Sequence, residues 1–227
     1  MATAASDRRP PGASRKPAET AAGTAPLVLI VEDDAGVRDG LGDLLASVGL
    51  ETRAFASTAE LLAATLPDRP GCLVLDVRLP GLSGLDLQAK LAAMGNRMPV
   101  IFMTGYGDVP MSVRAMKAGA LDFLTKPFND QDMLDAVAAA IERDAARRRA
   151  GAAADEVAEL AATLTPRETE IMAAVVKGLL NKQIAYDLGL SEITVKIHRG
   201  NVMRKMKAGS VADLVRKAEL LKARAQG

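Results

Sequence analysis

Short, fully apolar segments alternate with amphipathic stretches through the first part of the chain. Leu27–Val31 is the first of these segments, and residues 72–75 and 99–103 follow, with a further short strand expected at residues 121–124, which are apolar except for Asp122. Each has the length of a β-strand, and such a run is typical of a strand that is buried on both faces. Strands of this kind separated by helices predict βαβ units and a parallel sheet. We therefore predict a doubly wound α/β domain over residues 26–145.

Two amphipathic helices belong to this domain. In the first helix, apolar residues fall on one face at helical spacing, namely Val37, Leu41, Leu44, Leu45 and Val48. In the second helix, which should end the domain, the apolar face holds Met133, Leu134, Val137 and Ile141. Both helices fit the α/β pattern that the strands predict.

The C-terminal part of the chain shows helical patterns and no strand signal. Residues 146–162 begin with an alanine and three arginines and continue in an alanine-rich stretch, which we interpret as a partly helical linker. Thr165 then provides a helix N-cap, and Glu168 completes a capping box with it. Three short helices and a fourth one predict a helix bundle over residues 163–227.

The charge is unevenly distributed along the chain. Residues 26–145 hold ten basic and seventeen acidic side chains, whereas residues 146–227 hold fifteen basic and nine acidic ones. A basic half is a candidate for binding nucleic acid. Residues 1–25 contain almost no large apolar side chain, so we expect a disordered tail without a secretory signal. No apolar run could span a membrane, and a single cysteine fits the cytoplasm.

Charged and hydroxyl side chains stand where the predicted strands end. Glu32 and Asp33 follow the first strand, Asp76 the next, and Thr104 and Lys126 the later ones. The carboxyl ends of parallel strands meet at one edge of an open α/β sheet, so these groups should lie together. Clustered carboxylates repel one another and imply a divalent cation, and oxygen ligands favour Mg²⁺. One carboxylate can then attack phosphorus, while the lysine and the hydroxyl hold the phosphoryl oxygens.

Four segments resemble the receiver domain of two-component response regulators. They are Val-Glu-Asp-Asp at 31–34, Leu-Asp-Val-Arg-Leu-Pro at 75–80, Met-Thr-Gly at 103–105 and Thr-Lys-Pro-Phe at 125–128. The resemblance covers about residues 27–145 and implies a five-stranded, flavodoxin-like parallel sheet. It also implies a regulator that is no enzyme in the usual sense, since its own phosphorylation and slow dephosphorylation are its only chemistry.

The resemblance implies a role for each matching residue. Asp76 is the expected phosphoacceptor, and Asp33 is the expected direct ligand of Mg²⁺, with Glu32 assisting through water. Glu32 stands where an aspartate is commoner, which affects the metal geometry. Asp76 itself and the backbone carbonyl of Arg78 would complete the metal site. Lys126 would pair with the phosphoryl group, and the peptide bond between Lys126 and Pro127 would be cis. Thr104 would move towards the phosphoryl group, and Phe123 would be the aromatic side chain that changes position on phosphorylation.

Phosphatases of the haloacid dehalogenase type are a competing interpretation. They also use a strand-end aspartate with Mg²⁺, a threonine and a lysine. They require a second carboxylate two residues after the nucleophile, and here that position is Arg78, which cannot act as a general acid or base. The sequence also has no cap insertion that would form a small-molecule pocket, so we prefer the response regulator.

A helix-turn-helix is predicted after Gly178. Residues 180–185 begin one helix, Gly189 allows a tight turn, and Ser191 caps a second helix. Residues 162–222 resemble the LuxR-type output domain. Together with residues 105–120, they resemble the FixJ branch of response regulators, within the wider FixJ/NarL type.

The second helix of this motif should have an inner and an outer face. Val195, Val202 and Met206 recur at helical spacing and should face the core. The opposite face should enter the major groove of DNA, and it holds Ile193, Lys196, Ile197, Gly200 and Arg204. Phosphate contacts are expected from Thr194, His198, Asn201 and Lys205, with Lys182 on the preceding helix. A packed His198 and an ion pair between Lys196 and Glu192 are the open alternatives.

Together the two domains predict a transcriptional regulator that is activated by phosphorylation. A sensor histidine kinase would phosphorylate Asp76, and the segment 111–117 with the following strand and helix would then rearrange into a homodimer face. A dimer matches a two-fold site on double-stranded promoter DNA. RNA polymerase is a further expected partner. The alternative is a phosphorylation-controlled protein-interaction module that does not bind DNA.

Overall fold

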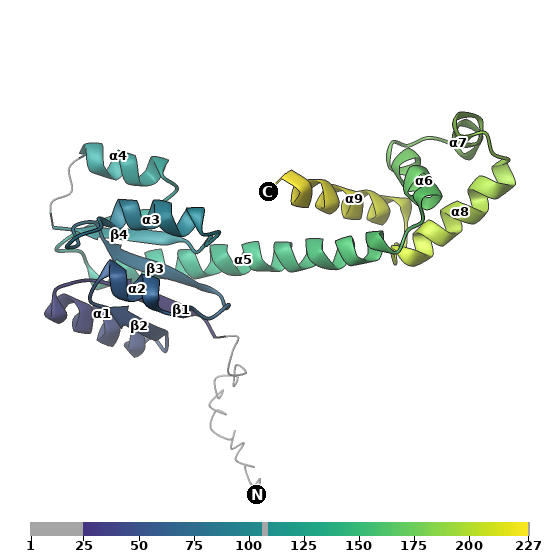
Figure 1. Cartoon of the computed structure of the whole chain (residues 1–227). Helices are drawn as coiled ribbons and strands as arrows, with labels where there is room; N and C mark the ends of the chain where they lie inside the picture. The colour runs from purple at the N-terminus through teal and green to yellow at the C-terminus, as the bar shows by residue number, and fades with distance from the viewer. Residues whose placement is uncertain (1–24, 106–108, 227) are drawn as a thin grey trace, which may run out of the picture.

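The computed structural model describes residues 25–105 and 109–226, and its first domain is a five-stranded parallel sheet with helices on both faces (Figure 1). The strands are β1 (Leu27–Val31), β2 (Glu51–Phe55), β3 (Gly71–Asp76), β4 (Val100–Thr104) and β5 (Asp122–Thr125). The helices are α1 (Ala35–Ser47), α2 (Thr58–Ala63), α3 (Gly84–Ala93), α4 (Val109–Lys117) and α5 (Asp130–Ala162). The strand order β2-β1-β3-β4-β5 reverses between β1 and β3, and open α/β sheets bind ligands beside such a reversal. The predicted doubly wound fold is confirmed.

Two apolar cores cover the two faces of the sheet. Successive side chains of a strand point to opposite faces, so neighbouring residues of β1 enter different cores. Leu29 shares one core with Leu61 and Leu87. Ile30 shares the other core with Leu45 and Val137. Burial on both faces explains why the central strands are apolar without interruption.

Strand β2 is the strand that the apolar pattern did not reveal. It lies at an edge of the sheet, and Phe55 is its only fully buried residue. An edge strand has one neighbour and one largely open side, so it needs no continuous apolar run. Val48 is a second difference from the prediction, because it is 52% exposed. It follows the end of α1 at Ser47 and therefore leaves the helical spacing of the buried face.

Helix α5 is much longer than the sequence pattern predicted. It runs without a break from Asp130 to Ala162, so the predicted linker over residues 146–162 is helical throughout. Alanine is the strongest helix former, and Ala154 and Val157 are buried in this stretch. The predicted disordered tail over residues 1–25 lies, except for Ala25, outside the described residues.

Asp144 ties α5 to the sheet at the amino end of β3. Its fully buried carboxylate accepts hydrogen bonds from the Gly71 amide at 3.1 Å, from Arg147 at 2.5 Å and from Arg148 at 2.8 Å. Burial acts to raise the pKa of Asp144, but the hydrogen bonds from Arg148, Arg147 and Gly71 outweigh it and lower the pKa. Arg148 also pairs with Asp68, in the loop before β3. A buried carboxylate needs such partners, so this cluster holds α5 where it leaves the sheet.

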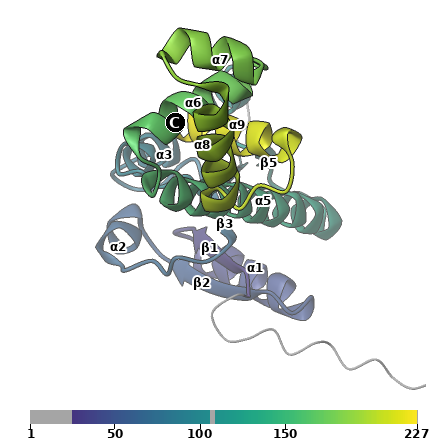
Figure 2. The same ribbon diagram turned by 90° about the vertical axis from the view of Figure 1, so that its right-hand side faces the viewer.

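The second domain is a helix bundle at the far end of α5 (Figures 1 and 2). It consists of α6 (Pro166–Val176), α7 (Asn181–Leu188), α8 (Glu192–Lys205) and α9 (Val211–Gln226), which confirms the four predicted helices. α9 packs along the last part of α5, and Val157 of α5 joins the core of the bundle. Among the helices of the described residues, none has the length and apolar character that a membrane span requires.

The capping box at the start of α6 is confirmed and has an additional partner. Thr165 Oγ1 accepts from the Glu168 amide at 3.3 Å, and the Glu168 carboxylate accepts from the Thr165 amide at 2.9 Å. Lys205, at the end of α8, places its ammonium 2.6 Å from the same carboxylate and 2.9 Å from the Thr163 carbonyl. The hydrogen bonds from Lys205 and Thr165 lower the pKa of Glu168 to about 2. These contacts fix α8 to the junction between α5 and α6.

Glu168→Gln should remove an acid-dependent contribution to the stability of the second domain. The pKa of Glu168 is lowered in the folded protein from an ordinary value of 4.5 to about 2. Its charge therefore stabilises the folded state above the ordinary value, and this contribution is lost as the pH falls towards 2. Thermal unfolding followed by circular dichroism at neutral pH and at pH ~3 measures it. The wild type should lose more thermal stability than Glu168→Gln, and equal losses would contradict the assignment.

Candidate functional site

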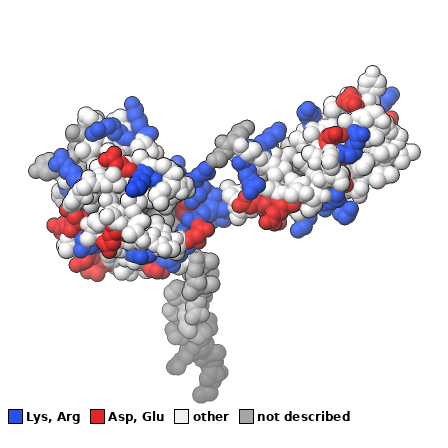
Figure 3. Space-filling view, in the orientation of Figure 1, with Lys and Arg blue, Asp and Glu red and all other residues white. Residues whose placement is uncertain are grey.

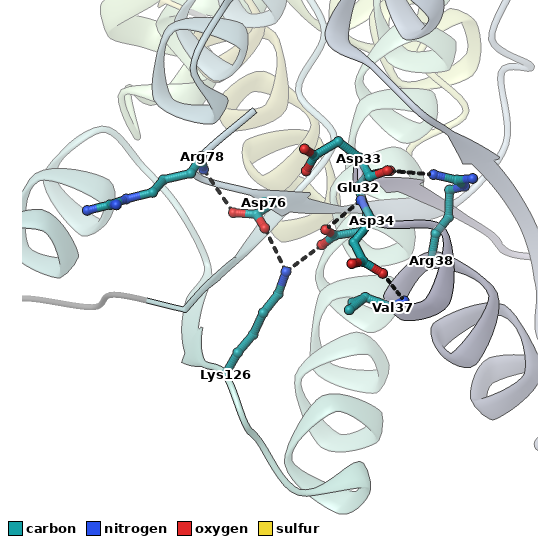
Figure 4. A network of polar contacts seen from close by, with 8 residues as sticks. All are labelled: Glu32, Asp33, Asp34, Val37, Arg38, Asp76, Arg78 and Lys126. Atoms are coloured by element: carbon teal, nitrogen blue, oxygen red, sulfur yellow. Dashed lines mark hydrogen bonds and ion pairs between the residues drawn. The ribbon is translucent and has the colours of Figure 1, made fainter. Parts of the chain in front are cut away.

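Three carboxylates gather at the carboxyl edge of the sheet (Figure 4). Glu32 and Asp33 follow β1, and Asp76 ends the neighbouring strand β3. One carboxylate oxygen of each residue lies within 4.8 Å of the others. Glu32 is buried, whereas Asp33 is exposed. The strand ends therefore bring together the acidic residues that the sequence pattern selected.

Lys126 bridges two of these carboxylates. It follows β5 at the same edge, and its Nζ lies 2.6 Å from both Glu32 Oε2 and Asp76 Oδ2. The predicted cis peptide bond between Lys126 and Pro127 is present. Burial acts to lower the pKa of Lys126, but hydrogen bonds to Asp76 and Glu32 outweigh it and raise the pKa. The ammonium therefore stays charged and holds the two strand ends together.

Hydrogen bonds with the backbone fix the Asp76 side chain and the segment that follows β1. Asp76 Oδ1 accepts from the amide of Arg78 at 2.8 Å, and the side chain of Arg78 is exposed. Arg38 Nη1 donates to the carbonyl of Glu32 at 2.9 Å and to that of Asp33 at 3.3 Å. The sequence pattern did not indicate Arg38, because an arginine in the first turns of a helix is usually a solvated surface residue.

The charge of the cluster fits a divalent cation. Three carboxylates face one ammonium, so the four side chains carry a net charge of −2 when all are ionised. Burial, together with the nearby charge of Asp76, raises the pKa of Glu32 in spite of the opposing effect of Lys126, so one lysine does not fully compensate this carboxylate. Exposed Asp33 opens the cluster to solvent. A donor set of oxygen atoms alone suits a hard cation.

The two predicted switch residues lie on the strands beyond β3. Thr104 ends β4, is fully buried, and stands next to Thr125 of β5 in the sheet. Phe123 of β5 stands next to Phe102 of β4 and packs, half-buried, against one of the two cores. Both therefore lie on the side of the site that leads to α4.

Helices α7 and α8 form the predicted helix-turn-helix. Gly189 ends α7 in the left-handed conformation with φ of 64°, which glycine adopts without steric cost, and Ser191 caps α8. Val195, Val202 and Met206 are fully buried, which confirms the inner face of α8. A hydrogen bond of 2.8 Å from Arg199 to Asn181 Oδ1 joins the two helices, and the sequence pattern did not indicate this pair.

The outer face of α8 carries apolar and basic side chains together. Ile193 is 74% exposed and Ile197 is 60% exposed, while Lys196, Gly200 and Arg204 are exposed as well. Large apolar side chains exposed on one helix face suit contact with another molecule. Of the residues predicted to contact phosphates, Lys182 is exposed on α7, whereas Thr194 and Asn201 are half-buried.

Lys205 has partners that the sequence pattern did not reveal. Its half-buried side chain binds Glu168 and the Thr163 carbonyl, so it has a structural role, and its contact with DNA phosphates stays a prediction. The physical reason is that the buried Glu168 carboxylate requires a cation within reach. His198 is half-buried, and its Nδ1 is buried without a hydrogen-bond partner among the described residues.

Comparison with known proteins decides the family. Residues 28–138 match the response regulator receiver domain, and residues 162–218 match the luxR family of bacterial regulatory proteins. The chain is 57% identical over 202 residues to nodulation protein W of Bradyrhizobium diazoefficiens, covering 89% of each chain. It is 49% identical over 193 residues to the transcriptional regulatory protein FixJ of Azorhizobium caulinodans, covering 85% of this chain and 92% of that one.

The chain belongs to the response regulators. The solved structure of the response regulator StyR superposes with a TM-score of 0.75 at 45% identity, over 86% of this chain and 99% of that one. This response regulator is thus a phosphorylation-dependent regulator of transcription, with a receiver domain and a LuxR-type DNA-binding domain. Its two domains imply a kinase and DNA as partners.

Lys126→Met should tighten the binding of a divalent cation to the unphosphorylated response regulator. The lysine ammonium offsets part of the charge of two carboxylates, and a unit charge at this range is worth several kcal/mol, so the Kd should fall by about tenfold or more when it is removed. Asp33→Asn should weaken binding. Calorimetric titration with Mg²⁺ measures both changes, with Lys117→Met on the exposed surface of α4 as the control. Weaker binding by Lys126→Met would show that the cation does not enter this cluster.

Proposed function

We propose that Asp76 is the phosphoacceptor and that Mg²⁺ supports the reaction at the acidic cluster. The observation that carries this proposal is the position of the Asp76 carboxylate, which lies beside Lys126, Glu32 and the exposed Asp33. Glu32, Asp33, Asp76 and the backbone carbonyl of Arg78 would hold the metal. Bound Mg²⁺ would neutralise the negative charge of the carboxylates and of the phosphoryl oxygens.

In the proposed reaction, a carboxylate oxygen of Asp76 attacks the phosphorus of a phosphohistidine on the kinase. The new P–O bond forms as the P–N bond breaks, and the imidazole leaves with the electron pair. The Arg78 amide orients the carboxylate through Oδ1. Lys126 stays charged beside Oδ2 and can pair with a phosphoryl oxygen, while the Thr104 hydroxyl would move towards the phosphoryl group.

The proposed chemistry ends with the aspartyl phosphate and its slow hydrolysis, so the protein is no enzyme for a separate substrate. A phosphatase with a similar site needs a carboxylate two residues after the nucleophile. That position is held by Arg78, whose side chain is exposed and whose amide is engaged with Asp76.

We further propose that phosphorylation promotes a homodimer through α4, β5 and α5. The phosphoryl group adds negative charge and acceptor oxygens at the edge of the sheet, next to Thr104 and Phe123. On α4, Val113 is 44% exposed and Met116 is 49% exposed, so apolar surface is available there. The predicted face over residues 111–117 lies within α4.

The proposed DNA interface is the outer face of α8 with Lys182 of α7. Ile193, Lys196, Ile197, Gly200 and Arg204 would enter the major groove, and Thr194, His198 and Asn201 would approach the backbone. A dimer would present two such helices to a two-fold promoter site. RNA polymerase at the same promoter is a further proposed partner, and the cytoplasm is the proposed location.

Acetyl phosphate with Mg²⁺ should label the protein on Asp76 alone. Asp76→Asn keeps the shape of the side chain but removes the nucleophilic carboxylate, so it should take up no label. Mass spectrometry of the intact protein and of its peptides measures the label, with Asp86→Asn on α3 as the matched control. Labelling of Asp76→Asn to the wild-type extent would mean that the site is assigned wrongly.

Phosphorylation should shift the protein from monomer towards dimer. Sedimentation velocity at micromolar concentration, with and without acetyl phosphate, measures the mass. Val113→Glu should reduce the shift, because it places a charge on the exposed apolar face of α4. Equal masses of the phosphorylated and unphosphorylated wild type would rule this coupling out.

Lys196→Ala and Lys182→Ala should affect DNA binding in different ways. If Lys196 contacts a base, its loss should cost ~1–3 kcal/mol on the cognate site and relax specificity there. If Lys182 contacts a phosphate, its loss should weaken binding to all sequences and lower the salt slope by about one. Titrations on cognate and scrambled DNA at several salt concentrations separate the two effects. Unchanged binding by both mutants would favour an interaction module that does not bind DNA.

A further inference from the structure

A hollow lies at the amino edge of the sheet, at the opposite end of the strands from Asp76. Its volume is about 460 Å³, and a second hollow of about 420 Å³ adjoins it and shares Leu61, Leu91 and Arg147. Leucine and valine side chains from β1, β3 and β4 line the first hollow, and α5 borders it where that helix leaves the sheet. Pockets of this size and apolar character bind small molecules.

One buried polar group in this hollow lacks a partner. Gln88 of α3 is 7% exposed, and its Oε1 has no hydrogen-bond partner among the described residues. It lines the first hollow together with apolar side chains such as Leu73 and Leu91. A buried acceptor without a partner is uncommon in proteins, because its loss of water is then not compensated. A group that donates a hydrogen bond to Gln88 would remove this deficit.

The opening of the two hollows is positively charged. Four arginines line them, namely Arg97, Arg143, Arg147 and Arg148, against two aspartates, Asp68 and Asp144. Both aspartates are already paired with arginine, and the Gly71 amide also donates to Asp144. With four arginines and two aspartates, the side chains that line the two hollows carry a net charge of +2. In the space-filling view, basic side chains gather where α5 leaves the first domain (Figure 3).

We propose that this hollow is a binding site for a small carboxylate that has an apolar body and one hydrogen-bond donor. The carboxylate would lie against the exposed Arg143, whose planar guanidinium suits it, and beside Arg147, whose Nε and Nη2 already donate to Asp144. The apolar body would cover the leucine side chains, and the donor would face Gln88 Oε1. The site is distinct from the acidic cluster, because it lies at the other edge of the sheet.

Such a ligand would act on the helix that joins the two domains. Arg147 lines the hollow and also holds Asp144, the residue that fixes α5 to the start of β3. From this point α5 continues to Ala162 and packs against α9. Occupation of the hollow would therefore stabilise the anchored position of α5, and the ligand would regulate the second domain independently of phosphorylation.

Calorimetric titration of the full-length protein tests the site with three related probes. The first is 3-(4-hydroxyphenyl)propanoate, which has a carboxylate, an apolar ring and a donor. 3-Phenylpropanoate lacks the donor, and 4-propylphenol lacks the charge. The first probe should bind at least about tenfold more tightly than either of the others, because only it satisfies both Gln88 and the arginines.

Two variants test whether the first probe binds in the hollow. Gln88→Leu should remove the advantage of the hydroxylated probe over 3-phenylpropanoate, and Arg143→Gln should weaken both carboxylates but not 4-propylphenol. Gln131→Leu and Arg149→Gln, at exposed positions of α5 outside the two hollows, are the matched controls and should change nothing. Should Gln88→Leu fail to fold, Arg143→Gln still tests whether the carboxylate binds in the hollow. Arg143 is exposed, so its replacement should not affect folding.

The proposal is wrong if none of the probes binds up to its solubility limit, since the hollow then holds only solvent. It is also wrong if the three probes bind equally, or if Gln88→Leu and Arg143→Gln bind the first probe as the wild type does.

Discussion

The structure depends on the balance of charge at the carboxyl edge of the sheet. The parallel arrangement of β1 and β3 forces Glu32, Asp33 and Asp76 together, and carboxylates at this distance repel one another. Lys126 reduces the repulsion but leaves the cluster negative. The excess of negative charge makes this edge attract a cation. A phosphoryl group adds further negative charge there, so the edge is also sensitive to phosphorylation. Both the proposed chemistry and the proposed switch follow from this constraint.

Helix α5 connects that edge of the sheet to the second domain. It begins beside the acidic cluster after β5, crosses the sheet, is held at the opposite edge by Asp144, and ends in the core of the second domain. Lys205 then fixes α8 to the end of the same helix through Thr163 and Glu168. The acidic cluster and the proposed DNA-binding helix are thus joined by one continuous helix with charged anchors. Within the part of the chain that the structure describes, α5 connects the domain that holds α4 and β5 to the bundle that holds α8.

The sequence predicted the parts of this structure that depend on local patterns. Fully apolar runs identified the central strands, strand ends identified Glu32, Asp76 and Lys126, and the Thr165 and Ser191 caps identified the helices of the second domain. Strand β2 could not be predicted from the apolar pattern, because an edge strand does not need an apolar run. The full length of α5 could not be predicted, because an alanine-rich segment is equally typical of a linker and of a helix. The partners of Asp144 and Lys205 could not be predicted, because ion pairs between residues far apart in the sequence leave no periodic signal.

The central claim is that phosphorylation of Asp76 controls DNA binding by α8. Its most direct test is the affinity of the full-length protein for a cognate promoter fragment, measured with and without phosphoramidate and Mg²⁺, in the wild type and in Asp76→Asn. The account predicts that the phosphodonor raises the affinity of the wild type by about tenfold or more, in the usual range of coupling between sites, and leaves Asp76→Asn unchanged. Equal wild-type affinities in the two conditions, with Asp76 shown to be phosphorylated, would contradict it.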